Sequence, residues 1–381
     1  MSAFPRICIV GAGFTGSVIA ERIASDAGMP VLVIDRRRHI GGNSWSEIDA
    51  ETGVEFHKYG SHIFHTSEQE VWKYISQFTR FNDYRHHVWS MCGGHVYAMP
   101  VNLSTINSFY GLALTPDEAR EFITREAARD GRAEAANLEE KAVSLIGRPL
   151  YEAFIRGYTA KQWEKDPKEL PPDIITRLPV RYTYDTRYFS DIWEGIPLDG
   201  YVGLFRKLSA HPLIEVRLGM DFADLRDSLS EAALIYTGAI DEYFGFRLGR
   251  LEWRTVDFEV ERPACADFQG TAVMNYADPD IPHTRIHEFK HFHPERQDTG
   301  KTLIFREYSR WACKGDEAYY PVDTAANRRL YADYAALAAH EAPDVVFCGR
   351  LGQYAYMDMD DAVAAALHCY TNTVRPRLLD A

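Results

Sequence analysis

The sequence predicts an α/β protein in which a Rossmann-like domain is combined with a helical insertion and an antiparallel β-sheet domain. Three observations predict this class. Residues 6–43 read as a strand, a glycine turn, a helix and a second strand ending in an acid; helix-start signals occur between 115 and 149; and alternating strand-like segments dominate after residue 180. A length of 381 residues, 46% of them hydrophobic, allows two or three domains with substantial cores.

Composition narrows the class of protein. No basic segment followed by an apolar one opens the chain, and no apolar run approaches the roughly 18 residues of a membrane span, so we expect a cytoplasmic protein. The six cysteines show no C-x-x-C pair, which favours reduced thiols over disulfides or zinc. The net charge of −13 argues against nucleic acid or an acidic membrane as a general partner. An anionic substrate would therefore need locally concentrated arginines.

The opening stretch carries a dinucleotide-binding signature. An apolar strand precedes Gly11, Gly13 and Gly16 in G-x-G-x-x-G spacing, and a helical pattern follows. These glycines allow a tight turn, close approach of the backbone to a pyrophosphate, and close helix–strand packing. The second strand ends at Asp35, at about the distance where an acid accepts from a ribose hydroxyl. The alternative is a merely structural glycine turn, which the strand, helix and acid together disfavour.

A second glycine pair bears on which dinucleotide binds. Gly41 and Gly42 follow the acid closely, so the backbone can approach the ligand again; this favours FAD over NAD, with a surface turn as the alternative. The final segment repeats the theme with a buried strand at 345–348 and a glycine turn. Arg350 in that turn could form a bidentate contact with a phosphate. Asp358 is either an N-cap or marks a helix N-terminus directed at a flavin ring.

The remaining elements follow from caps, alternation and proline. Capping boxes at Ser67 and Thr115 and a helix start at Asn137 predict helices, and alternation around Gly93-Gly94 predicts a hairpin. Alternating segments further on suggest an antiparallel sheet with one face open to a ligand. The helices are expected over 67–78, 115–129, 137–147, 149–158, 201–209 and 358–368, the hairpin over 84–102, and strands over 180–189, 233–236, 251–261, 271–276, 284–293 and 302–309.

Residues 163–179 are predicted to form a long loop. They contain four prolines, mixed charges and no sustained period. Loops of this length are usually functional or disordered. Flanking aromatics and Arg177 favour a functional lid.

One motif matches a metal site only in its letters. Residues 287–291 read H-E-x-x-H, which binds zinc when both histidines share one face of a helix. Prolines flank the segment and its apolar residues fit a strand, on which residues four apart lie roughly 13 Å from one another. Zinc bonds are about 2 Å long, so we predict no metal here.

Arginines and aromatics supply candidate ligand contacts. Most arginines are solvated surface groups and many tyrosines belong to cores, so each residue is weak evidence alone. Tyr158 and Trp163 flank the lid, and we expect them to stack on a nucleotide base. The residues singled out are Arg177, Arg285, Arg306, Arg350, Tyr158, Trp163, Tyr188, Tyr319, Tyr320 and Tyr356.

At this point the chain resembles prokaryotic UDP-galactopyranose mutases over its whole length. The strings that carry the resemblance include GAGFTGSVIAERIA, DRRRHIGGN, KYGSHIFHT, GYTAKQW, RLPVRYTYDTRYF, TRIHEFKHFHPER, GDEAYYPV and GRLGQYAYMDMDDAV. Several of these strings are specific to that family rather than common to flavoproteins.

The resemblance implies the roles of individual residues. It implies catalytic roles for Arg177, Arg285 and His62, with His62 beside the flavin and the two arginines on a diphosphate. The implied FAD-binding residues are Gly11, Gly13, Phe14, Thr15, Gly16, Asp35, Arg36, Gly42, Asn43, His62, Gly349, Arg350, Tyr356, Asp358 and Met359. The implied substrate-binding residues are Tyr158, Trp163, Arg177, Tyr188, Asn275, Arg285, Tyr319, Tyr320, Tyr356 and Asp358; spacing does not decide between Tyr319 and Tyr320.

The resemblance also implies the chemistry. It implies a redox-neutral isomerase that interconverts UDP-galactopyranose and UDP-galactofuranose, in which N5 of reduced FAD attacks the anomeric carbon, UDP leaves, and the covalent flavin–sugar adduct lets the ring open and reclose. A nicotinamide reductant and a homodimer are implied as well. The alternatives are a flavin amine oxidase or desaturase, which shares the nucleotide domain, and a non-enzymatic flavin or nucleotide sensor.

We expect three domains from these patterns. A discontinuous Rossmann-like FAD-binding domain comprises residues 1–80, 195–245 and 340–381. A helical domain comprises 100–180, with a mobile lid at about 164–179. An antiparallel-sheet substrate domain comprises 81–99, 181–194 and 246–339.

Overall fold

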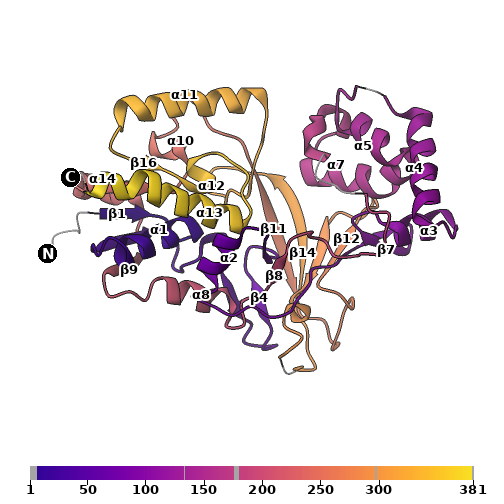
Figure 1. The fold of residues 1–381 in the computed structure, drawn as a ribbon, viewed down its shortest axis with the longest axis horizontal. Helices are drawn as coiled ribbons and strands as arrows, with labels where there is room; N and C mark the ends of the chain where they lie inside the picture. Colours follow the sequence, from indigo (N-terminus) through magenta and orange to yellow (C-terminus); the bar gives the residue numbers. More distant parts are fainter. Residues whose placement is uncertain (1–6, 133, 176–179, 297, 380–381) are drawn as a thin grey trace.

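The computed structural model describes residues 7–132, 134–175, 180–296 and 298–379. Figure 1 shows three parts next to one another: a parallel sheet with its helices near both chain ends, a long antiparallel sheet in the middle, and a helical part farthest from the termini. The parallel sheet collects strands that are far apart in the sequence. The predicted fold class is confirmed.

The first sheet has five strands, all parallel, in the order β16-β10-β1-β2-β9. Strands β1 and β2 are buried along their length because side chains cover both faces. Helices α1, α8 and α13 pack on one face, and a cluster around Phe222 and Tyr243 covers the other. The bounds are β1 (Ile7–Val10), β2 (Val31–Asp35), β9 (Ile214–Leu218), β10 (Ala233–Tyr236), β16 (Val346–Phe347), α1 (Phe14–Ser25), α8 (Gly200–Leu208) and α13 (Met359–Cys369).

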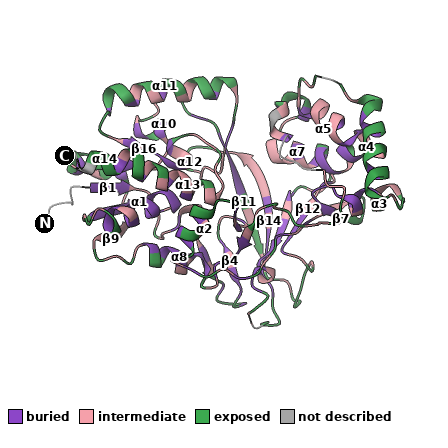
Figure 2. Ribbon diagram, viewed as in Figure 1, coloured by how far each residue is buried: buried purple, intermediate pink, exposed green. Residues whose placement is uncertain are grey.

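A helix that the sequence pattern did not reveal, α11 (Ala325–Glu341), lies over α10 (Ile240–Tyr243). The side chain of Thr324 caps its start. Asn327, Tyr334 and Ala338 are buried, and Leu330, Tyr331 and Leu337 pack beside them, so one stripe of the helix faces α10. Figure 2 shows its outer surface exposed, whereas β1 beneath it is buried.

The second sheet has seven strands in the order β15-β11-β14-β13-β12-β6-β7. Every pair in it is antiparallel except β12 with β6. The predicted hairpin around Gly93-Gly94 is confirmed as β6–β7. The bounds are β6 (Val88–Cys92), β7 (His95–Met99), β11 (Trp253–Glu261), β12 (Val273–Tyr276), β13 (Arg285–Glu288), β14 (Ile304–Trp311) and β15 (Tyr320–Pro321).

Two predicted strands need correction. Residues 180–189 form bends, and only an isolated bridge joins Arg187 to His87. The Asp185 side chain accepts from the Arg187 backbone N–H at 3.0 Å, and such local bonds compete with strand pairing. The strand predicted over 284–293 ends at Glu288 and continues as a 3₁₀ turn over Phe289–Phe292.

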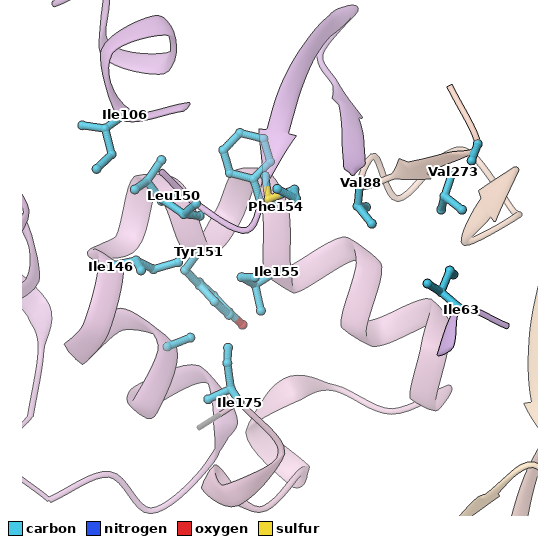
Figure 3. Close-up of a cluster of buried hydrophobic side chains, with 14 of the residues drawn as sticks. Ile63, Val88, Ile106, Ile146, Leu150, Tyr151, Phe154, Ile155, Ile175 and Val273 are labelled. Atoms are coloured by element: carbon cyan, nitrogen blue, oxygen red, sulfur yellow. The ribbon is translucent and has the colours of Figure 1, made fainter. Parts of the chain in front are cut away.

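The helices of the helical part pack around one apolar core. The capping box of Thr115 with Glu118 and the Asn137 cap are confirmed, whereas the helix capped by Asn102 was not predicted. Figure 3 shows part of this core, in which Tyr151 points toward Ile175; Val88 and Val273 of the antiparallel sheet belong to the same cluster. The bounds are α3 (Leu103–Tyr110), α4 (Pro116–Asp130), α5 (Leu138–Ile146), α6 (Arg148–Leu150), a π-helical turn (Tyr151–Arg156) and α7 (Gly157–Trp163).

The segment after α7 is more ordered than the predicted loop. It forms two 3₁₀ turns, Pro167–Glu169 and Pro172–Ile175. Leu170 is buried, and its carbonyl accepts from the Leu138 N–H at 2.9 Å. The prolines therefore start short turns that pack on the helical core. Arg177 lies outside the described residues, and the lid stays a prediction.

Shorter elements connect these parts. The capping box predicted at Ser67 is wrong: α2 begins at Gln69 and ends at Ile75, while the Ser67 hydroxyl donates to Asp191 at 2.7 Å. Within the described ranges, no helix is long and apolar enough to cross a membrane. The other bounds are β3 (Ser46–Ile48), β4 (Glu55–His57), β5 (Phe64–Thr66), β8 (Trp193–Gly195), α2 (Gln69–Ile75), α9 (Phe222–Leu225), α12 (Gly349–Gly352) and α14 (Arg375–Leu379).

Candidate functional site

One large cavity is lined by all three parts of the molecule. Its volume is about 1530 Å³, larger than the roughly 300–1,000 Å³ typical of a pocket for one small molecule. Gly13 and Asp35 reach it from the parallel sheet, Arg285 from the antiparallel sheet, and Tyr158 and Trp163 from α7. Of the residues that the resemblance implied as site residues, all those described line this cavity except Gly16. Sequence and structure therefore point to one shared site.

The glycine turn after β1 is packed too closely for side chains. A Cβ on Gly42 would lie 3.2 Å from the Gly13 Cα, because the turn and the second glycine pair approach each other at the cavity wall. Gly16 faces inward instead, where a Cβ would lie 1.9 Å from the Gly11 carbonyl oxygen. Gly13 and Gly42 thus leave exposed backbone at the cavity wall for a ligand, whereas Gly16 serves helix–strand packing.

Asp35 is held by backbone donors at the end of β2. Its two carboxylate oxygens accept from the N–H groups of Ala12 and Arg37, each at 2.8 Å. The side chain is buried at the cavity wall. Each carboxylate oxygen has a further lone pair, so Asp35 can also accept from a ligand hydroxyl.

Arg350 places a half-buried positive charge beside this cradle. Its guanidinium donates to the carbonyls of Tyr319 and Ala318, the latter at 2.9 Å. Burial lowers the pKa of Arg350 to about 10, so the group is still charged at neutral pH. Arg36 and Arg37, by contrast, are paired with Glu317. The guanidinium has five donors, which leaves Arg350 able to bind an anion as well.

His62 is a half-buried, neutral imidazole. Burial lowers its pKa to about 4, against the hydrogen bond with the Gly60 carbonyl, which lies 2.7 Å from Nδ1. Because a carbonyl only accepts, Nδ1 carries the proton and Nε2 is left as an acceptor. The loop that holds His62 is anchored by its N–H, which donates to Nδ1 of His57 at 3.0 Å.

Arg285 is the charged centre of the sheet side of the cavity. Its Nε lies 3.1 Å from Oε1 of Glu307 on the next strand, and it donates to the Tyr158 hydroxyl. Burial alone would lower the pKa of Arg285, but the Glu307 carboxylate and the neighbouring tyrosines together raise it. Burial alone would raise the pKa of Glu307, but Arg285 and His287 bring it down to about 2. The pair is therefore fully ionised at neutral pH.

Two further contacts complete this network. His287 Nε2 lies 3.0 Å from the second oxygen of Glu307, and its Nδ1 lies 2.5 Å from the Ser61 hydroxyl. Ser61 directly precedes His62, so a chain of polar contacts joins Arg285 to the loop that carries His62. Asn275 lies on the neighbouring strand, and its buried Oδ1 has no hydrogen-bond partner in the part of the chain that the structure describes. A ligand donor would satisfy it.

The tyrosines divide between the two ends of the cavity. The rings of Tyr320 and Tyr356 stack with centroids 6.1 Å apart, and the Tyr356 hydroxyl donates to Asp358 at 3.1 Å. Tyr320 lies among the charges of Arg285 and Glu307, whereas Tyr319 lies nearer Arg37 and Glu317. Tyr320 thus belongs to the sheet end and Tyr319 to the glycine-turn end. Asp358 also forms the predicted cap of α13.

Several site residues were missed by the sequence analysis. Arg254 is only 1% exposed and lines the cavity. Its Nη1 pairs with Glu164 at 2.9 Å, while its buried Nε has no hydrogen-bond partner among the described residues. Glu307 and His86 also line the cavity. The signal available for Arg254 is its alternation with Val256 and Phe258 along the strand predicted over 251–261.

Arg306 lies apart from the site, and the H-E-x-x-H segment contributes only His287 to it. Arg306 pairs with Glu261 and is not among the lining residues. The H-E-x-x-H segment is not a helix: His287 faces Glu307, while His291 lies 3.3 Å from Asp267. Ligand-type atoms of Asp267, Glu288 and His291 lie within 4.8 Å of one another. The Glu288 oxygens, however, each accept from a backbone N–H at 2.8 Å.

Comparison with known proteins gives matches over nearly the whole chain. A family model described as UDP-galactopyranose mutase matches residues 153–356, and one described as an NAD(P)-binding Rossmann-like domain matches residues 9–78. A probable UDP-galactopyranose mutase of Klebsiella pneumoniae is 42% identical over 362 residues, covering 95% of this chain and 93% of that protein. A dTDP-fucopyranose mutase of Escherichia coli is 39% identical over 369 residues, covering 96% and 97%.

Solved structures share the fold at lower identity. The crystal structure of a reduced UDP-galactopyranose mutase matches with a TM-score of 0.71 and 16% identity, covering 98% of this chain and 96% of that one. A putative protoporphyrinogen oxidase from Exiguobacterium sp. 255-15 matches with a TM-score of 0.60 and 12% identity, covering 97% and 98%. At these identities the matches show a common fold and nothing finer.

Proposed function

Because the chain belongs to the UDP-galactopyranose mutase family, we propose that it interconverts UDP-galactopyranose and UDP-galactofuranose with FAD as its cofactor. One observation carries the proposal. A single cavity joins the glycine turn, where Gly13 and Gly42 leave the backbone exposed, to Arg285, which lies among tyrosines. An isomerisation that uses a cofactor without net oxidation needs both ligands side by side. The cavity offers that arrangement.

The residues around the glycine turn fit FAD. The close approach of Gly13 and Gly42 leaves backbone free for a pyrophosphate, Asp35 can accept from a ribose hydroxyl, and Arg350 supplies positive charge. In its reduced form FAD supplies a nucleophilic N5 for the anomeric carbon of the sugar. A neutral His62 with a free Nε2 suits the edge of the flavin, since it adds no charge there.

The residues at the sheet end fit a nucleotide sugar. Arg285 faces the diphosphate, and we assign Arg177 to the same group from the lid at 164–179. Tyr158 and Trp163 stack on the base, with Asn275, Tyr188, Tyr320 and Tyr356 around the sugar and phosphates. Glu307 holds the Arg285 guanidinium in place, so the charge that meets the diphosphate is oriented before binding.

The test is a turnover assay with the purified protein at two redox states. UDP-galactofuranose is incubated with and without dithionite, and UDP-galactopyranose is separated by chromatography. We expect product only from the reduced protein. Turnover that requires the oxidised protein, or consumes oxygen in proportion to product, would instead support the amine oxidase or desaturase alternative.

A second candidate substrate has its own observation. The dTDP-fucopyranose mutase of Escherichia coli is 39% identical to this chain, nearly as similar as the Klebsiella relative. dTDP-fucopyranose differs from UDP-galactopyranose by an added methyl group on the base, a missing ribose hydroxyl and a missing sugar hydroxyl. Parallel assays with UDP-galactopyranose and dTDP-fucopyranose decide between them, and we expect the higher kcat/KM with the UDP-sugar.

Two further assignments belong to this proposal. We expect a homodimer or larger homo-oligomer and reduction of the flavin by NADH or NADPH. Light scattering on a sizing column measures the first. Stopped-flow bleaching of the flavin absorbance by each nicotinamide measures the second.

A further inference from the structure

We propose that Lys161 is a positioning residue, which fixes the nucleotide-binding face of α7 to the strands that carry Asn275 and Arg285. The inference rests on the proposed function. It concerns a residue that does not line the cavity but stands between two groups of residues that do.

The Lys161 ammonium is held by four backbone carbonyls at the end of β12 and in the loop that follows it. Nζ lies 2.6 Å from the oxygen of Tyr276, 2.9 Å from those of Asp278 and Ile281, and 3.2 Å from that of His283. Three protons thus serve four acceptors, one on the last residue of β12 and three in the connection between β12 and β13. Burial lowers the pKa of Lys161 to about 8, against the carboxylates of Asp278 and Asp280, so the ammonium is charged at neutral pH.

Gly157 makes a second close contact on the same face of α7. Gly157 precedes Lys161 by four residues, so both face the β12–β13 loop. A Cβ on Gly157 would lie 2.2 Å from the Ala277 carbonyl oxygen. The helix therefore rests on the loop at one point where only glycine fits and at another where the ammonium gathers the carbonyls.

The elements joined in this way carry the proposed ligand contacts. Tyr158 and Trp163 are on α7, Asn275 is on β12, and Arg285 starts β13. The Tyr158 hydroxyl accepts from Arg285 across the same junction. Without the ammonium, the four carbonyls would lose their shared partner and the loop would separate from α7, so the base-binding aromatics would lose their alignment with the diphosphate arginine.

The test uses the FAD-loaded protein reduced with dithionite and compares Lys161→Met with Lys141→Met. Lys141 lies on α5 of the same helical part, outside the proposed lid, and does not line the cavity, so it controls for loss of a lysine in this region. We expect Lys161→Met to raise the Kd for UDP and the KM for the UDP-sugar by about tenfold while kcat changes less than about threefold. Lys161→Arg, which keeps the charge in a bulkier planar group, should restore only part of the affinity.

Gly157→Ala gives an independent measurement with the lysine intact. The added methyl group must push α7 off the loop, so this variant should also raise the Kd for UDP. Hydrogen exchange should rise in 157–163 and 273–288 in both variants and stay unchanged in the helices of the parallel-sheet part. Gly157→Ala also tests the junction if Lys161→Met folds too poorly to assay.

Three outcomes separate the possibilities. A wild-type protein that does not bind UDP would overturn the proposed function, whereas hydrogen exchange would still report on the junction. A wild-type protein that binds UDP, with Lys161→Met and Gly157→Ala equal to it, would overturn the positioning role. Equal losses of kcat, FAD content and folded protein, with KM unchanged, would show a merely structural lysine and overturn the role as well.

Discussion

Arg285 on β13 and Glu307 on β14 stand directly opposite each other in the antiparallel sheet, with Nε 3.1 Å from Oε1. Glu307 also accepts from Thr284 at 3.0 Å and faces His287 at the same distance. Each partner keeps the other ionised at the cavity wall. The orientation of the Arg285 guanidinium therefore depends on a carboxylate from another strand, which lies far from Arg285 in the sequence.

We expect Glu307→Gln to lower kcat/KM for the UDP-sugar by about 10–100-fold, because the fixed orientation of Arg285 and the charge partner of His287 are both lost. The matched control is Glu261→Gln, which removes a carboxylate from another arginine pair of the same sheet, outside the cavity. Steady-state kinetics measure both variants. Equal values of kcat/KM for the two would contradict the role of Glu307.

Gly42→Ala should weaken FAD binding about tenfold, because the new Cβ would lie 3.2 Å from the Gly13 Cα at the cavity wall. Gly28→Ala is the control: its φ of +65° is close to the +57° of Gly42, but nothing lies within 4 Å of the added atom. Both variants carry a similar backbone strain of about 1–2 kcal/mol. Flavin retained after dialysis, measured by absorbance, separates strain from contact, and equal retention would exclude the cradle.

Local chemistry explains what could be predicted from sequence. The glycine turn with Asp35, the Thr115–Glu118 capping box and the Asp358 cap each depend on residues a few positions apart, so their signals survive without the fold. Most of the cavity wall could be predicted by family resemblance, but the resemblance gave no partners. Helix α11 was missed although Leu330, Tyr334 and Leu337 recur at helical spacing, because alanines on its exposed face weaken the contrast with its buried stripe.

The partners of the site residues could not be predicted, because they depend on strand register. Arg285 meets Glu307 only through the pairing of β13 with β14, and Arg254 meets Glu164 only when α7 ends beside β11. The Lys161 ammonium likewise gathers carbonyls from a loop more than a hundred residues away. Residue type alone does not distinguish such buried charges from solvated ones.

Arg177→Ala should lower kcat/KM by at least about tenfold, since one of two diphosphate contacts would be removed from the lid. The residue lies outside the described part of the chain, so this variant tests an assignment that rests on family resemblance. Arg156→Ala is the control, because Arg156 is exposed on the same helical part and pairs with Glu152. Full activity of Arg177→Ala would refute the lid assignment.

His86 should make the stability of the fold sensitive to acid. Burial lowers the pKa of His86 from 6.5 to about 3, with Arg285 and neighbouring histidines adding to the shift. Between these two values the unfolded chain binds a proton that the folded protein does not, so folded stability falls as the pH falls. The slope from this one group is about 1.4 kcal/mol per pH unit.

His86→Gln should therefore show a shallower loss of unfolding free energy between pH 6 and pH 4, with the slope reduced by about 1.4 kcal/mol per pH unit. His340→Gln, at an exposed position on α11, should keep the wild-type slope. Urea unfolding at several pH values measures all three proteins, and a wild-type slope for His86→Gln would show that His86 is not the group that resists protonation.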